Sequence, residues 1–155
     1  MSETSCEVGP TTHNASLFKE GRQAYHGSCH CGALKYSVEI DFLTNKSVRC
    51  NCSFCTKIRI WEVLVKPEFF KLLEGQDSYT TYKFGEKAHS HYHCKHCGIR
   101  CHGFSIIPDM GGDFIAISIN TLDDLTDEQM SSLIVQPLDG RNNNWFEVPK
   151  FHNHL

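Results

Sequence analysis

Seven of the nine cysteines fall into three short clusters, and these are the residues whose type and spacing could do chemistry. In chain order they are Cys29 and Cys31, then Cys50, Cys52 and Cys55, then Cys94 and Cys97. Zinc is bound by cysteine thiolates at about 2.3 Å in a tetrahedron, and thiols one or two residues apart on a turn can reach the same ion. A single pair is a weak signal, whereas three clusters in one chain are a strong one.

The spacing leaves two ways of dividing these thiols between metal ions. In the first, the upstream and downstream pairs close a four-sulfur site, and Cys50, Cys52 and Cys55 hold a second ion with one position vacant. In the second, Cys52 and Cys55, the last two thiols of the central triplet (Cys50, Cys52 and Cys55), bind one ion together with the downstream pair, as in a zinc ribbon. Cys101 then joins Cys50 and the upstream pair at another closed site. Closed zinc sites are structural, whereas three protein ligands and an open position are typical of catalytic sites.

Length and composition restrict the class of protein. A chain of 155 residues with 40% hydrophobic and 21% charged residues suits one globular domain. The formal net charge of −3 argues against nucleic acid as a partner. No apolar run approaches the ~20 residues of a membrane span, and the first twenty residues lack the order of a signal peptide. We therefore expect a cytoplasmic protein whose cysteines are free thiols, without membrane or nucleic-acid partners.

Strands are the elements expected to position the clusters. Residues 1–22 are polar and are interpreted as a flexible tail that carries Cys6. The domain is expected over 23–149, followed by a short tail at 150–155. Alternating apolar residues at 34–40 predict a half-buried strand. A short strand at 47–49 and another at 58–65 would place the central cluster on a bend between them.

The remaining elements follow from local signals. Pro67 and the apolar residues of 68–73 predict a short helix that ends at Gly75. The glycines that follow two of the clusters are expected at positive φ, where the backbone turns around an ion. Trp145 and Phe146 are expected to hold the C-terminus against the core. Further predictions are a hairpin at 79–84 and 87–93, strands at 99–105 and 114–119, the latter central in its sheet, and a helix that starts near Thr126.

With these residues in view, the sequence resembles the family of glutathione-dependent formaldehyde-activating enzymes and centromere protein V. The resemblance covers roughly residues 23–149. The matching segments are Gly27-Ser28-Cys29-His30-Cys31-Gly32, Cys50-Asn51-Cys52-Ser53-Phe54-Cys55, Cys94-Lys95-His96-Cys97-Gly98, Asn120-Thr121-Leu122-Asp123-Asp124 and Asp139-Gly140-Arg141. The cysteine order C-x-C, C-x-C-x-x-C, C-x-x-C is specific.

The resemblance implies a mostly β fold of bent sheets, the β-tent (Mss4-like) class, with one or two short helices and two zinc ions. It also implies the first division of the thiols. The upstream and downstream pairs would take a structural zinc, and Cys50, Cys52 and Cys55 a catalytic one that is open to a substrate thiol. The activity implied is that of a carbon–sulfur lyase acting on S-hydroxymethylglutathione, formed from glutathione and formaldehyde. Fold does not by itself settle function.

Several residues depart from the pattern or stand near it without a role. Cys101 is either an idle core cysteine or the residue that closes the second zinc site. Lys57 to Arg59 follow the triplet without the glycine expected there. Lys57, Arg59 or Arg141 could bind a carboxylate of a glutathione-like substrate, although solvated surface charge is the commoner role. Histidines near the clusters could act as a base or a ligand but are simpler to explain as polar strand residues: His30, His89, His91, His93, His96 and His102.

Three functions remain open on the sequence. In the first, an external thiol at the vacant position is deprotonated and attacks a carbonyl carbon to give a hemithioacetal. The alternative is a non-catalytic, zinc-stabilised protein-interaction module like the centromere protein V branch. The third is a zinc-buffering or redox protein.

Overall fold

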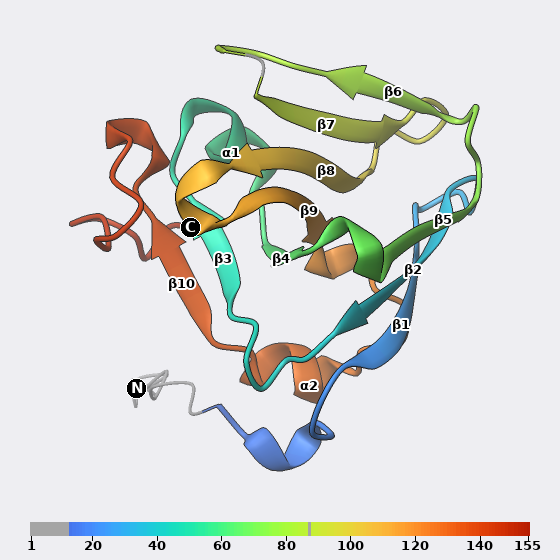
Figure 1. Ribbon diagram of the computed structural model, residues 1–155, viewed down its shortest axis with the longest axis horizontal. Helices are drawn as coiled ribbons and strands as arrows, with labels where there is room; N and C mark the ends of the chain where they lie inside the picture. Colours follow the sequence, from blue (N-terminus) through green and yellow to red (C-terminus); the bar gives the residue numbers. More distant parts are fainter. Residues whose placement is uncertain (1–12, 87) are drawn as a thin grey trace, which may run out of the picture.

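The computed structural model describes residues 13–86 and 88–155, which form two β-sheets and several short helices (Figure 1). Cys6 lies outside the described residues. The strands are β1 (Gln23–Ser28), β2 (Lys35–Ile40), β3 (Ser47–Cys50), β4 (Glu62–Val65), β5 (Phe70–Glu74), β6 (Tyr79–Tyr82), β7 (His89–Cys94), β8 (Arg100–Ile107), β9 (Gly112–Ser118) and β10 (Val135–Leu138). The helices are α1 (Ser53–Ile58) and α2 (Asp127–Ser132), with 3-10 turns at Ala15–Leu17, Pro67–Phe69, Pro108–Met110, Ile119–Thr121 and Gly140–Asn142.

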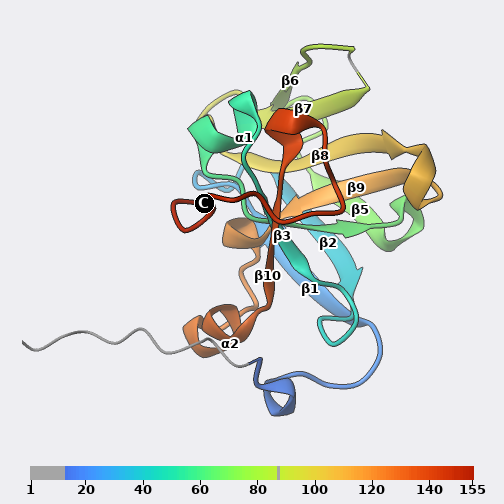
Figure 2. The ribbon, with the colours of Figure 1, turned by 90° about the vertical axis from the view of Figure 1, so that its left-hand side faces the viewer.

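The two sheets have different sizes. The smaller is antiparallel with the order β1-β2-β5, and the larger has the order β10-β3-β4-β9-β8-β7-β6. In the larger sheet only the β10–β3 pair is parallel among the described strands. Strands β1 and β2 of the small sheet lie below β8 and β9 of the large sheet in both views (Figures 1 and 2). The expected mostly β fold with bent sheets and two short helices is confirmed.

The hydrophobic core lies between the sheets. From the small sheet, Tyr36, Val38 and Ile40 on β2 are fully buried, as the alternation in the sequence predicts. From the large sheet, Val63 and Ile117 face them. Burial of such side chains contributes about 1.5–3 kcal/mol each, so the two sheets are held together mainly by this apolar layer.

Two sequence predictions about the strands are confirmed. Residues 79–82 and 89–94 pair as the antiparallel hairpin β6–β7. Strand β9 is the middle strand of the large sheet, and residues 114–118 in it are buried on both faces. The helix expected near Thr126 is also present as α2. Thr126 is its N-cap and forms a capping box with Gln129.

The helix predicted at 68–73 is wrong. Only Pro67–Phe69 forms a 3-10 turn, and residues 70–74 form the edge strand β5, which pairs with β2. Phe70 and Leu72 are half-buried while their neighbours are exposed, so the burial period is two. Phe70 packs 5.6 Å from the Tyr36 ring. Tertiary pairing with β2 therefore overrides the local helix signal.

The strand predicted at 58–65 begins later than expected. Helix α1 (Ser53–Ile58) starts inside the central cysteine cluster, and β4 begins only at Glu62. The triplet therefore lies where β3 runs into a helix rather than on a bend between two strands. No helix of the described residues has the length and apolar character needed to cross a membrane.

The chain ends also differ from the expectation. Trp145 is 43% exposed and Phe146 is 82% exposed, so the prediction that both hold the C-terminus against the core is wrong. Near the other end, Phe18 is buried and packs 5.4 Å from the Phe42 ring, and His13 contacts the carbonyl of Ser132. Residues 13–18 are thus attached to the core through these contacts.

Candidate metal centres

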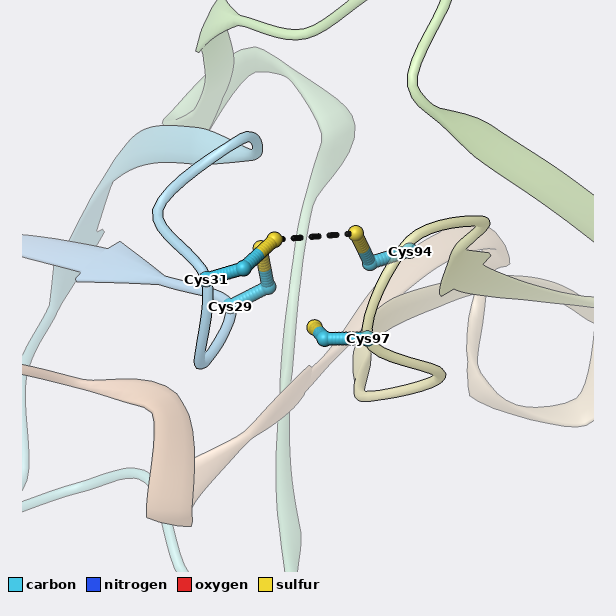
Figure 3. Close-up of side chains that lie close together, drawn as sticks. All are labelled: Cys29, Cys31, Cys94 and Cys97. Carbon is cyan, nitrogen blue, oxygen red and sulfur yellow. Dashed lines mark hydrogen bonds between the residues drawn. The ribbon is translucent and has the colours of Figure 1, made fainter.

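The upstream and downstream cysteine pairs come together in one group of four sulfurs (Figure 3). Cys29 Sγ lies 3.6 Å from Cys31 Sγ, and Cys31 Sγ lies 3.7 Å from Cys94 Sγ. All four sulfurs, including that of Cys97, lie within 4.8 Å of one another. A regular tetrahedron with metal–sulfur distances of about 2.3 Å has sulfur–sulfur edges of about 3.8 Å. The observed spacing therefore fits one zinc ion.

Two turns with the same geometry hold these sulfurs. Gly32 and Gly98 each follow a cysteine pair and each has φ of 77°, as the sequence predicts. At this angle a side chain would be strained, and the reversed backbone aims amide groups at the sulfurs. The Leu34 amide donates to Cys29 Sγ at 3.3 Å. Backbone hydrogen bonds of this kind orient and stabilise thiolate ligands.

The four-sulfur group joins the two sheets. Cys29 follows directly on β1 in the small sheet, whereas Cys94 ends β7 in the large sheet. Cys29 and Cys94 are almost fully buried, and Cys31 is exposed. Backbone hydrogen bonding favours the thiolate of Cys97 and lowers its pKa to about 6. A metal ion here would act as a cross-link between the sheets.

The central cluster forms a second group, in which the sulfurs of Cys50, Cys52 and Cys55 lie within 4.8 Å of one another. Cys50 is the last residue of β3, and Cys52 is the N-cap of α1. The amide of Cys55 donates to Cys52 Sγ at 3.4 Å, so the start of the helix is capped by a sulfur. The sulfurs are thus divided as in the first of the two arrangements that the sequence left open.

The three thiols of this group differ in acidity. Hydrogen bonds from the Cys50 and Cys55 thiols, followed by backbone amides, lower the pKa of Cys52. The same contacts raise the pKa of Cys55, and the contact with Cys52 raises the pKa of Cys50 to about 11. One thiolate, at Cys52, is therefore favoured even without a cation. Three sulfurs with one residual negative charge are a donor set that a soft divalent cation fits.

The loop of residues 139–145 covers one side of the triplet. Gly140 lies so close that a Cβ placed on it would be 2.6 Å from Cys50 Sγ and 3.1 Å from Cys52 Cβ. The side chain of Asn51, which lies between Cys50 and Cys52 in the sequence, forms two hydrogen bonds with this loop. It donates to the Asp139 carboxylate and accepts from the Arg141 amide. Only a glycine at position 140 permits this packing.

A hollow of about 130 Å³ opens on another side of the triplet. Cys50 and Cys55 line one wall, and His154 and Leu155 of the C-terminal segment line the other. Both ribbon views place the C-terminus beside α1 (Figures 1 and 2). Thr56 on α1, and Arg59 and Ile60 just after it, complete the lining. The triplet is therefore accessible to a small molecule from this side.

Cys101 and the histidines considered in the sequence belong to neither sulfur group among the described residues. Cys101 is fully buried in the core and belongs to neither group, and burial raises its pKa to about 12. Among the described residues, no histidine joins either group. His102 is buried between aromatic rings, with Phe70 at 4.7 Å and Tyr92 at 4.8 Å. These residues are explained by packing.

A buried polar network beside the triplet was not predicted. Arg100 Nη2 lies 3.1 Å from Glu62 Oε2, and Arg100 Nε donates to His91 Nδ1 at 3.2 Å. The His91 ring packs 4.1 Å from that of Phe54 on α1, so the network supports the helix that carries Cys55. No local pattern in the sequence indicates this network, because Arg100 begins β8, a strand that also carries His102 and Ser105. The partners of Arg100 are His91, Ser118 and Glu62, which lie 9, 18 and 38 positions away and share no motif with it.

The fold and the two thiol groups define a mostly β protein with bent sheets and cysteine groups that could hold metal ions. The sequence pattern of one family, described as glutathione-dependent formaldehyde-activating enzyme, matches residues 24–134. The chain belongs to this family. A crystal structure of a Rhodobacter sphaeroides protein superposes with a TM-score of 0.60 at 23% identity, over 71% of this chain and 98% of that one. This likeness supports the fold.

Proposed function

We propose that the protein is a zinc-dependent carbon–sulfur lyase that acts on adducts of glutathione, or a similar thiol, with an aldehyde. S-hydroxymethylglutathione is the substrate that the family description suggests. The observation that carries the proposal is the asymmetry between the two sulfur groups. Four sulfurs complete a tetrahedron at one, whereas the triplet offers three and borders a hollow. We assign one zinc ion to each group, a structural one and a catalytic one.

The residues of the triplet would hold the catalytic ion. Zinc bound to Cys50, Cys52 and Cys55 would supply an open Lewis-acid position that lowers the pKa of an incoming thiol. Hydrogen bonds from the Cys50 and Cys55 thiols, followed by the backbone amides at the start of α1, lower the pKa of Cys52 and so favour the form that binds a cation. Gly140 packs against Cys50 and Cys52 on another side of the triplet.

The hollow beside Cys50 and Cys55 would hold the thiol and the aldehyde together. Formation of the adduct joins sulfur to the carbonyl carbon, and the former carbonyl oxygen takes a proton to become a hydroxyl. Cleavage is the reverse. The protein accelerates either direction by orienting the two partners, which replaces a bimolecular encounter by one within the site. No oxidant or reductant is needed.

A non-catalytic interaction module is the second candidate. The observation that favours it is the exposed apolar surface of the C-terminal segment, where Phe146 is 82% exposed and Phe151 is 73% exposed. Large exposed apolar side chains can form a contact surface for another protein. In that function both metal ions would be structural.

Metal content and thiol binding distinguish these functions. We would measure zinc per chain and follow the sulfur coordination of zinc by X-ray absorption while glutathione is added. The lyase proposal predicts two zinc ions and a gain of one sulfur ligand at one of them. Cys52→Ser should abolish this gain, and with it any turnover of S-hydroxymethylglutathione. Two zinc ions already at four protein ligands, indifferent to glutathione, would overturn the lyase proposal and favour the interaction module.

A further inference from the structure

Arg59 has a backbone conformation that is unusual for its type. It ends α1 in the left-handed region, at φ 50° and ψ 54°, where its amide donates to the Cys55 carbonyl. Glycine is the usual residue at this position, and asparagine tolerates it. Asn143 is the other non-glycine residue with positive φ in the described chain. Strain of this kind at a candidate site suggests that the side chain is retained for another reason.

Stabilisation of the helix does not explain the arginine. A basic residue near a helix C-terminus is favourable, but Lys57 already supplies this charge in the last turn. Among the described residues, no carboxylate forms an ion pair with Arg59. The Arg59 side chain is exposed. Its guanidinium is thus an unpaired cation four residues after Cys55.

Arg59 is among the lining residues of two hollows. One is the hollow beside Cys50 and Cys55. The other, of about 250 Å³, lies between α1 and the turn of the four-sulfur group, with Trp61, His93 and Ile99 among its lining residues. No Asp or Glu is among the described residues that line either hollow. Arg59 therefore faces no carboxylate side chain in either hollow.

A second guanidinium strengthens the positive charge. Arg49 lies in β3, packs its guanidinium 5.0 Å from the Trp61 ring, and donates to the Leu155 carbonyl at 2.7 Å. Leu155 lines the hollow beside the triplet together with Arg59, so both arginines lie near this hollow. Arg49 is held by its contacts with Trp61 and Leu155, whereas Arg59 is left to bind a ligand.

We propose that Arg59 binds a carboxylate of the thiol substrate and so selects carboxylated thiols. The inference rests on the proposed function, since it places the substrate thiol at the triplet. Arg59 and Cys55 line the same hollow, so a small thiol held at the triplet would lie beside the Arg59 guanidinium. The substrate class is a cysteine-containing small molecule with a free carboxylate.

The test compares N-acetylcysteine with its amide, which differ in one carboxylate. We would measure the affinity of both for the zinc-loaded protein by calorimetry. A charge-assisted hydrogen bond predicts that the wild type prefers the acid about tenfold. Arg59→Gln should abolish the preference, whereas Lys57→Ala and Arg141→Ala should keep it. The ratio of the two affinities, compared between variants, cancels the difference in thiol acidity.

A thioether arm separates this inference from the proposed function. S-methyl-N-acetylcysteine has no thiol, so we would follow its contact with the hollows through the amide chemical shifts of Trp61 and Ile99. We expect shifts in the wild type and none in Arg59→Gln. If no thiol binds at the triplet but these shifts appear, the lyase proposal fails and the carboxylate site stands. Three results would overturn the carboxylate site. They are a preference for the acid that survives in Arg59→Gln, a preference for the acid that is lost in Arg141→Ala, and an absence of chemical-shift changes in the wild type.

Discussion

Asn51 and Asp139, separated by 88 positions in the sequence, form a buried hydrogen bond in which Asn51 Nδ2 donates to Asp139 Oδ1 at 2.7 Å. The same Asn51 side chain accepts from the Arg141 amide at 2.9 Å. Asn51 lies between two cysteines of the triplet, so this pair fastens the loop of residues 139–145 against the sulfurs. The asparagine between the two cysteines therefore positions the loop of residues 139–145 against the triplet.

Asn51→Ala should destabilise the protein and loosen the triplet. The change leaves the Asp139 carboxylate and the Arg141 amide without their partner, and an orphaned buried group costs about 1–3 kcal/mol. Chemical denaturation would measure the free energy of unfolding, and competition with a chelator the affinity of the second zinc. Asn142→Ala is the control, since Asn142 also binds Asp139 but does not touch the cysteines. If both variants lost zinc equally, the role assigned to Asn51 would be wrong.

Gly140→Ala should weaken metal binding at the triplet alone. A Cβ at this position would lie 2.6 Å from Cys50 Sγ and 2.9 Å from the Trp145 ring, so either the loop or the sulfur must move. We expect at least a tenfold loss of zinc affinity at the triplet and none at the four-sulfur group. Gly85→Ala is the matched control, because it strains a hairpin turn at φ 60° with open space around it. Equal zinc affinity in the two variants would contradict the packing argument.

The two sulfur groups should respond differently to the loss of one thiol. Cys29→Ser removes a ligand that joins the two sheets, and we expect loss of cooperative unfolding and of most tertiary structure. Cys52→Ser should retain the fold with one zinc per chain, because its helix start can still be capped by a hydroxyl. Near-ultraviolet circular dichroism and zinc analysis would compare them. A folded Cys29→Ser with two zinc ions would show that the first group is not structural.

Acid should destabilise the protein through His102. Burial lowers its pKa to about 4 from the ordinary value of 6.5. The unfolded chain therefore binds a proton at pH 6 to 5 while the folded chain does not, and stability falls as pH falls through this window. The loss is about 1 kcal/mol per pH unit for this residue.

His102→Phe isolates the contribution of His102. Phenylalanine suits the surrounding rings, and His102 Nδ1 has no hydrogen-bond partner to lose among the described residues. We expect the decline in unfolding free energy between pH 6 and 5 to be about 1 kcal/mol smaller than in the wild type. Urea titrations with a zinc-sensitive dye would separate this effect from metal loss. His89→Gln, on the exposed side of β7, should leave the slope unchanged. An unchanged slope in His102→Phe would contradict a neutral buried imidazole.

The cysteine clusters and the alternating strands were readable from the sequence because they depend on local spacing. The conformation of Gly32 and Gly98 belongs to the same kind of information. The spacing of the cysteines did not determine which clusters share a metal ion, because that depends on how the sheets that carry Cys29 and Cys94 pack together. The strand at 70–74 was missed because its pairing with β2 outweighs the helical signal of Pro67. The network of Arg100, Glu62 and His91 depends on strand register across the large sheet, which no local pattern encodes.

Arg59→Gly should make the protein more stable while it weakens binding of carboxylated thiols. The left-handed conformation costs a residue with a Cβ about 1–2 kcal/mol, and glycine adopts it without that cost. Glycine also gains entropy in the unfolded chain, worth about 0.5–1 kcal/mol in the other direction. The net increase in unfolding free energy should be about 0.5–1 kcal/mol by urea denaturation of the zinc-loaded protein. Asn143→Gly is the matched control, and its effect should be near zero because asparagine tolerates φ of 54°. A loss of stability in Arg59→Gly would mean that the guanidinium supports the fold itself, and the strain would then need no substrate to explain it.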